Sequence, residues 1–301
     1  QVAHLDVYQR SAPYVIPKPD RIYQPLEKKA FRKLPILQSL DRALQYGHHE
    51  IRLLAFTTSL NEMPLVEYLF QRHIRKVVKD GKLRHRLMPD YPIGCKRILF
   101  ANNYYPALQA PNTTLIPHGL VKVEGNTVVA ENGERHEVDV IIWGTGFEVS
   151  HPPIGKRVHN EKGQCLQDIW KDSSPEAYLG TNIENVPNAF LILGPNVLVY
   201  DSFIGLAEAQ LDYIVDGLLK IKNKGISKLN VKSDVIKKHN DLVQKHLQTT
   251  VFNSGGCKSY YLDANGRNFA AWPWSLKKLK QRLKKLDLKD YEVTYQMSKT
   301  H

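Results

Sequence analysis

The sequence predicts an α/β fold, because strand-like apolar segments alternate with helical segments along its 301 residues. Such alternation is typical of the α/β class. Two segments, 138–143 and 189–193, are almost continuously apolar and each runs into a glycine-containing turn. A strand of this composition is expected to be buried on both faces. Ligands of α/β sheets bind beyond the carboxyl ends of the strands, so a nucleotide cofactor is expected near these turns.

The first third of the chain contains one strand and a long helical region. Residues 2–8 have the apolar composition of a strand, and residues 13–25 hold four prolines and predict an extended connection. Helical periodicity covers residues 26–87 and is clearest over 64–79. Residues 88–113, with prolines and glycine, are expected to be irregular.

The rest of the chain alternates between short strands and helices. Apolar segments separated by asparagine–glycine turns predict strands at 114–116, 119–123, 127–130 and 136–143. A further buried strand is expected at 189–193, and apolar periodicity predicts helices at 205–221 and 234–249.

The net charge of +12 is partly concentrated in residues 275–286. Leucines at 276, 279, 283 and 286 recur there at helical spacing, with lysines between them. This pattern favours a surface helix that is docked by its leucines. A nucleic-acid-binding protein is the weaker alternative, since no nucleic-acid-binding motif accompanies the charge. We therefore expect no nucleic-acid partner.

Metal-binding and membrane-spanning patterns are not found in the sequence. The three cysteines form no CxxC pair, and no histidines have metal-ligand spacing, so no metal site is expected. No apolar window of about 18 residues predicts an integral membrane segment. The first residues lack the pattern of a signal peptide, which favours a cytoplasmic location.

Cationic side chains occupy two positions where a nucleotide phosphate could bind. Arg10 and Ser11 follow the first strand, and in a dinucleotide-binding fold an arginine there accommodates the 2′-phosphate of NADP. Lys96 and Arg97 are adjacent in a loop shaped by proline and glycine. Loops held rigid on a scaffold are common places for functional side chains.

Several ordered motifs resemble Baeyer–Villiger flavin monooxygenases. The motifs from the first half of the chain are VYQRSAPYV (7–15), YPIGCKR (91–97), NYYPAL (103–108) and VDVIIWGTGF (138–147). Those from the second half are YLG (178–180), VPN (186–188), LGPN (193–196), CKSYY (257–261), GRN (266–268) and WP (272–273). The last three resemble the branch of hydroxyacetophenone monooxygenase. The resemblance covers nearly all of residues 1–280.

The resemblance implies an incomplete fold of the flavoproteins that have two dinucleotide-binding domains, for FAD and NADP. Residues 1–137 would be the remainder of the NADP-binding domain, with a helical insertion at about 26–87. Residues 138–285 would be the C-terminal part of the FAD-binding domain, and 286–301 a polar tail. The family's N-terminal GxGxxG loop does not occur in these residues. We therefore expect the isolated fragment to bind FAD poorly and to be inactive.

The resemblance also implies roles for individual residues. Arg97 would be the catalytic cation beside the flavin, and Lys96, Arg10 and Ser11 would bind the 2′-phosphate of NADP. Two turns would approach FAD, namely Gly144-Thr145-Gly146-Phe147 and Gly194-Pro195-Asn196.

The function expected of the intact protein is oxidation of a ketone or aldehyde by O2, with FAD and NADPH as cofactors. Two alternatives stay open. One is a flavin monooxygenase that oxidises nitrogen or sulfur, or that only makes peroxide. The other is a non-catalytic remnant, favoured by the missing glycine loops. The substrate's identity and the oligomeric state do not follow from the sequence.

Overall fold

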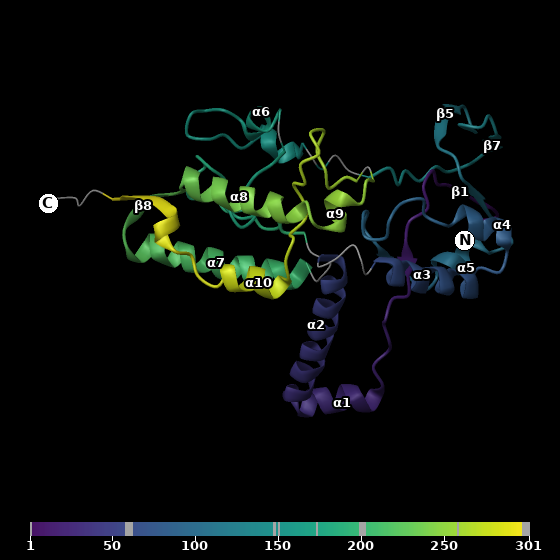
Figure 1. The fold of residues 1–301 in the computed structure, drawn as a ribbon, viewed down its shortest axis with the longest axis horizontal. Helices are drawn as coiled ribbons and strands as arrows, with labels where there is room; N and C mark the ends of the chain where they lie inside the picture. Colours follow the sequence, from purple (N-terminus) through teal and green to yellow (C-terminus); the bar gives the residue numbers. More distant parts are fainter. Residues whose placement is uncertain are drawn as a thin grey trace. The chain divides into compact units, whose positions relative to one another are not determined.

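The computed structural model describes residues 2–57, 63–146, 149, 151–172, 174–198, 203–257 and 259–296. The chain forms two compact units, whose elements are labelled in Figure 1. Unit 1 comprises residues 1–23 and 61–147, and unit 2 comprises residues 24–60 and 148–301.

Unit 1 contains a parallel pair of strands that ends beside the predicted phosphate-binding residues. Strand β1 (Leu5–Tyr8) pairs with β4 (Thr113–Ile116) over four positions. The backbone N–H of Gln9 donates to the carbonyl of Ile116 at 3.0 Å, which continues the pairing toward Arg10. The strands predicted at 2–8 and 114–116 are confirmed.

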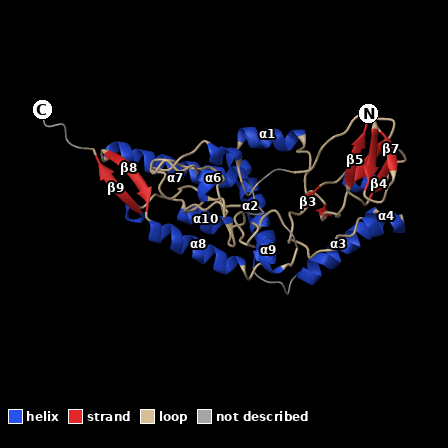
Figure 2. Cartoon of the chain, turned by 90° about the horizontal axis from the view of Figure 1, so that it is seen from above, coloured by secondary structure: helices blue, strands red, loops and turns tan. Residues whose placement is uncertain are grey.

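Unit 1 contains two further sheets (Figure 2). Strand β2 (Val15–Ile16) lies in the proline-rich connection and pairs in parallel with β3 (Leu99–Phe100). An antiparallel sheet has the order β5-β6-β7. Its strands are β5 (Leu120–Glu124), β6 (Thr127–Ala130) and β7 (Arg135–Glu137).

The predicted helical region over 26–87 is confirmed, but its helices divide between the two units. Unit 2 includes α1 (Pro25–Lys33) and α2 (Pro35–Thr57). The side chains of residues 48–57 of α2 are not described. Unit 1 includes α3 (Met63–Val77) and α4 (Gly81–Arg86). The Asp80 side chain caps α4 by accepting from the backbone N–H of Lys82 at 2.8 Å. The domain boundaries inferred from the resemblance remain a proposal.

Unit 2 is built mainly from helices. The two long ones are α7 (Phe203–Asn223) and α8 (Ser233–Leu247), which confirm the helices predicted at 205–221 and 234–249. The short helices of unit 2 are α6 (Leu166–Ile169), α9 (Val251–Ser254), α10 (Leu276–Arg282) and the 3₁₀ turns Pro153–Lys156 and Leu288–Asp290. Unit 1 has one further short helix, α5 (Tyr104–Leu108), among its described residues.

The basic helix near the C-terminus is docked as the sequence predicts. Helix α10 lies along α7 (Figure 1), and leucines 276, 279, 283 and 286 are each at most 1% exposed. Ser275 caps the helix, its side chain accepting from the backbone N–H of Lys278 at 3.2 Å. The leucines therefore stabilise the helix through burial, while Lys277 and Lys278 face solvent.

The segment 286–301 is not simply a polar tail. Residues Tyr291–Tyr295 form strand β9, which pairs antiparallel with β8 (Ile226–Val231). Tyr291 is buried, and its hydroxyl lies 2.5 Å from that of Tyr213. The polar composition of this segment gave no sign of a strand, because an antiparallel pair buries only one face and leaves the other polar.

The two apolar strands that motivated the fold class are not strands in this structure. β7 ends at Glu137, and residues 138–146 have no strand partner among the described residues. Val140 and Ile142 are 75% and 89% exposed. Residues 189–193 likewise form no strand, and Leu193 has a φ of 56°. An apolar segment becomes a buried strand only when neighbouring strands pair with its backbone. Among the described residues, neither segment has such a neighbouring strand.

A buried histidine lies at the centre of unit 2. His239 is 4% exposed, and its Nε2 accepts from the backbone N–H of Leu179 at 3.3 Å. The Trp272 ring stacks on it at 6.3 Å, and the Tyr178 ring meets it edge-on at 5.3 Å. Burial, followed by the nearby Arg282 charge, lowers the pKa of His239 from 6.5 to about 3.

We expect unit 2 to lose stability as the pH falls below about 6.5. The unfolded chain then binds a proton at His239 that the folded protein excludes until about pH 3, so the folded state is penalised over that window. Between pH 7 and pH 5 the loss from this one group is about 2 kcal/mol. Urea unfolding followed by tryptophan fluorescence measures it.

The His239→Gln variant should show a shallower dependence on pH, whatever its absolute stability. His246→Gln is the matched control, because His246 lies on the same helix, makes an exposed hydrogen bond to the carbonyl of Leu242 and, like His239, packs against a tryptophan ring, Trp274. Equal slopes for wild type and His239→Gln would contradict this assignment.

Candidate functional site

Buried apolar side chains anchor the loop that carries Lys96 and Arg97. Ile93, Cys95 and Ile98 are at most 2% exposed. Gly94 has a φ of 88°, a left-handed conformation that favours glycine. Along the loop, residues 93–95 and 98 are buried, Lys96 is half-buried and Arg97 is exposed.

Tyr14 joins this loop to the proline-rich connection. Its hydroxyl donates to the carbonyl of Tyr91 at 2.8 Å, and its own carbonyl accepts from the N–H of Leu99 at 2.9 Å. The ring packs edge-on against Phe70 at 4.7 Å. Burial, reinforced by the charge of Glu67, raises the pKa of Tyr14, so the phenol stays protonated and remains a donor.

Glu67 brings the helical region to the same loop. It projects from α3, and its Oε1 accepts from the backbone N–H of Ile93 at 3.2 Å. The same oxygen lies 3.5 Å from the hydroxyl of Tyr14. One carboxylate on α3 therefore stabilises the turn of the loop that carries the two cations.

The ammonium of Lys96 lies over an aromatic ring. Its Nζ is 4.3 Å from the centroid of Tyr91. A cation at this distance is attracted by the negative face of the ring. Tyr91 in turn meets the Tyr14 ring edge-on at 5.5 Å. The position of Lys96 is thus linked to the same anchor as the backbone of the loop.

Arg10 and Ser11 are both exposed and follow β1 after one intervening residue, Gln9. A Cβ at Gly119 would lie only 2.6 Å from Oε1 of Glu131 and 3.0 Å from Cδ of Arg10. The backbone N–H of Gly119 also donates to Glu131 Oε2 at 3.0 Å. Glycine at this position therefore makes room for the arginine stem and the carboxylate, side by side.

The turn at 144–147 is exposed where it is described. A Cβ at Gly144 would meet no described atom within 4 Å, whereas Gly146 has a φ of 92° that requires glycine. Packing within the described residues accordingly gives no reason for glycine at 144. Phe147 lies outside the described residues.

The turn at 194–196 is packed tightly in unit 2. A Cβ at Gly194 would lie 2.4 Å from the carbonyl of Gly180, so only glycine fits. The amide of Asn196 donates to the carbonyls of Asn268 at 2.8 Å and Ala271 at 3.1 Å. Its Oδ1 is buried and has no partner among the described residues. Asn196 therefore offers a fixed acceptor.

The predicted site residues divide between the units. Arg10, Ser11, Lys96, Arg97 and residues 144–146 belong to unit 1. Residues 194–196 belong to unit 2. The single site that the sequence predicts therefore draws on both units, and its assembly remains a prediction.

Sequence reasoning missed the residues that support the loop. Tyr14 and Tyr91 occur within the quoted motifs, but their contacts with each other depend on tertiary structure. Glu67 gave no signal, since a glutamate in a helix usually faces solvent. Tyr104 was also missed; its hydroxyl donates to Oε1 of Gln9 at 2.5 Å and so contacts the residue that precedes Arg10.

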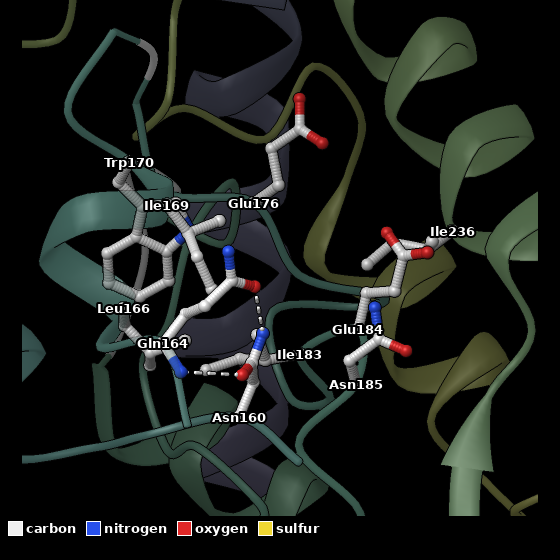
Figure 3. A pocket seen from close by; sticks show the side chains of 10 residues that line it. All are labelled: Asn160, Gln164, Leu166, Ile169, Trp170, Glu176, Ile183, Glu184, Asn185 and Ile236. Atoms are coloured by element: carbon white, nitrogen blue, oxygen red, sulfur yellow. Dashed lines mark hydrogen bonds between the residues drawn. The ribbon is translucent and has the colours of Figure 1, made fainter. Parts of the chain in front are cut away.

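A separate cavity of about 190 Å³ lies in unit 2 (Figure 3). Its apolar wall belongs to a small core of Leu166, Trp170 and Ile183. The Asn160 side chain accepts from the backbone N–H groups of Lys162 and Gln164 and donates to the Gln164 side chain. The acidic groups are also partnered, Glu176 by Arg267 and Glu184 by Ser233. The side chains of Asn160, Glu176 and Glu184 in this cavity are thus engaged by neighbouring residues of unit 2.

Two kinds of site are not found in the part of the chain that the structure describes. Its histidine, cysteine and acidic side chains form no group of three or more that could hold a metal ion. None of its helices combines the length and apolarity that crossing a membrane requires.

Solved structures identify the class of fold. A complex of OTEMO with FAD and NADP superposes with a TM-score of 0.78 and 18% identity, covering 97% of this chain and 62% of that one. Cyclohexanone monooxygenase from Rhodococcus sp. Phi1, bound to NADP+, gives a TM-score of 0.77 and 19% identity, covering 98% and 63%. The chain therefore has an incomplete form of this α/β flavoprotein fold, which confirms the expected fold class.

Sequence relatives are more specific, although no family model matches the chain. A Baeyer–Villiger monooxygenase of Pseudomonas aeruginosa is 41% identical over 295 residues, covering 97% of this chain and 56% of the relative. One from Streptomyces coelicolor is 38% identical, covering 97% and 57%. The chain thus spans little more than half the length of these relatives. Over nearly its whole length, it corresponds to a portion of a Baeyer–Villiger-type flavin monooxygenase.

Replacing Glu67 tests the anchoring of the loop. Glu67→Ala leaves the buried N–H of Ile93 without its acceptor, and a buried unpaired donor costs about 1–3 kcal/mol. Glu67→Gln keeps a carbonyl oxygen at that place and should cost clearly less. Urea unfolding of the two variants measures the difference. Equal losses would show that the hydrogen bond to Ile93 does not hold the loop.

Proposed function

We propose that the natural protein is an FAD- and NADPH-dependent monooxygenase that inserts one oxygen atom from O2 into a ketone or aldehyde. Two relatives with 38–41% identity over 97% of the chain carry the name Baeyer–Villiger monooxygenase, which supports this reaction. The observation that carries the proposal is the loop at 91–97. It presents two adjacent cations on a braced turn, and one of them is exposed and permanently charged.

The residues of unit 1 fit the phosphate of NADP. Arg10 is exposed, Lys96 is half-buried, and the exposed hydroxyl of Ser11 adds a neutral donor. A guanidinium binds a phosphate bidentately, while an ammonium acts as a point charge. Arg10, Ser11 and Lys96 would thus hold the 2′-phosphate, and NADPH when bound supplies the hydride.

The residues of the two turns fit the flavin. The open space at Gly144 permits close approach of a planar group, and Thr145 and Gly146 follow it on the same exposed turn. Phe147, the next residue in the sequence, completes the proposed flavin-binding set. Gly194, Pro195 and Asn196 would lie beside the flavin on a turn that the bonds from Asn196 to the carbonyls of Asn268 and Ala271 hold rigid. FAD when bound receives the hydride and activates O2.

Arg97 would provide the fixed positive charge of the reaction. Oxygen transfer to a carbonyl develops negative charge on oxygen, and a preorganised cation stabilises it without having to reorient. A guanidinium keeps its charge at every working pH, so no proton needs to move at this residue. The buried Ile98 beneath it and the hydrogen bond from Tyr14 to Tyr91 hold its backbone in place.

Arg97→Ala in the natural holoenzyme should lower the rate of ester formation from a ketone by at least about 100-fold, because a preorganised charge is lost. FAD content should not change, because Arg97 is not among the residues proposed to hold the flavin. Product analysis by gas chromatography, with flavin absorbance as the check on cofactor content, measures both.

Lys237→Ala is the matched control, since Lys237 is an exposed cation paired only with Asp241 in unit 2. Normal ester formation by Arg97→Ala would remove the catalytic role from this residue. Oxidation of a thioether but of no ketone by the wild type would favour the alternative enzyme class.

A further inference from the structure

The contact between Tyr91 and Lys96 has a consequence for the choice of cofactor. We propose that Tyr91 is a positioning residue that holds Lys96 for the adenosine 2′-phosphate and thereby sets the preference for NADPH over NADH. This inference rests on the proposed function. The observation behind it is the position of Lys96 Nζ, 4.3 Å from the centroid of the Tyr91 ring.

Tyr14 contacts both the ring and the backbone of Tyr91. The planes of the Tyr91 and Tyr14 rings meet at 84°, and their centroids are 5.5 Å apart, which is an edge-to-face contact. Tyr14 is held in turn by Phe70 on α3, again edge-to-face. The carbonyl of Tyr91 accepts from the Tyr14 hydroxyl at 2.8 Å. Ring and backbone of Tyr91 are therefore both tied to one buried residue.

A lysine gains from such a platform because its side chain is flexible. Ordering a lysine side chain upon binding a ligand costs conformational entropy, and preorganisation removes part of that cost. The attraction to the ring acts on the charge of the ammonium. Its N–H donors that point away from the ring can still bind phosphate oxygens. Tyr91 thus orders Lys96 without competing for the ligand.

The effect is specific for one cofactor. The 2′-phosphate is the only group that distinguishes NADPH from NADH, so a change at Lys96 alters the binding of NADPH alone. A substitution that merely disturbed the fold would weaken both cofactors or lower kcat. The ratio of the two KM values therefore separates positioning from general damage.

The experiment uses the natural holoenzyme and measures KM and kcat with NADPH and with NADH. Tyr91→Leu should raise KM for NADPH roughly 3- to 10-fold, the range of a cation–π contact, and leave KM for NADH and kcat unchanged. Tyr91→Phe retains the ring and should keep the preference. Tyr68→Leu is the matched control, because Tyr68 is an exposed tyrosine on α3 at 59% exposure.

A double-mutant cycle with Lys96→Met completes the test. Once Lys96 is replaced, Tyr91→Leu should have no further effect on KM for NADPH. If Tyr91→Leu does not hold FAD, Tyr91→Met takes its place, since methionine fills a similar space.

An unchanged KM ratio in Tyr91→Leu, or equal losses with both cofactors, would overturn the inference while the proposed function stands. A wild type that oxidises no ketone would instead overturn the proposed function. The two failures are therefore distinguishable.

Discussion

The hydrogen bond from the Tyr14 hydroxyl to the carbonyl of Tyr91 is the interaction on which the candidate site depends. It joins two segments more than 70 residues apart in the sequence, and the parallel pairing of β2 with β3 extends the junction. The donor of this bond is the hydroxyl of Tyr14, a residue that is only 5% exposed, so opening the junction would leave a buried hydroxyl without its acceptor. Because Lys96 and Arg97 follow Tyr91 within one turn, their positions depend on the position of this carbonyl.

Two adjacent cations repel each other, and the structure separates them by burial. Lys96 turns toward the Tyr91 ring, and Arg97 remains exposed. The carboxylate of Glu67 accepts a hydrogen bond from the backbone of the same loop, so a negative charge lies next to that backbone. The loop therefore carries two cations of different kinds. The flexible one is ordered by an aromatic face, and the planar one is free of any requirement for proton transfer.

The helices could be predicted from the sequence because their signal is local, whereas several strands and contacts could not. The leucines of α10 recur every three or four residues, and this spacing alone determines which face is buried. Residues 138–143 have the composition of a central strand, but burial depends on neighbours that composition cannot reveal. For the site, the adjacent cations were visible in the motif. Glu67 was not, because its partner lies 26 residues away.

The two halves of the proposed site differ in how far this chain's own packing accounts for them. Around the cations, Gly119, Tyr14 and Glu67 each have an identifiable partner, and the sequence is explained by contacts within unit 1. At the two turns proposed to bind the flavin, the described contacts do not explain every feature. Gly144 has no neighbour that requires glycine, and Oδ1 of Asn196 is buried without a donor. Buried acceptors are rarely left unpaired, so Oδ1 of Asn196 is a feature that the described packing of unit 2 does not explain.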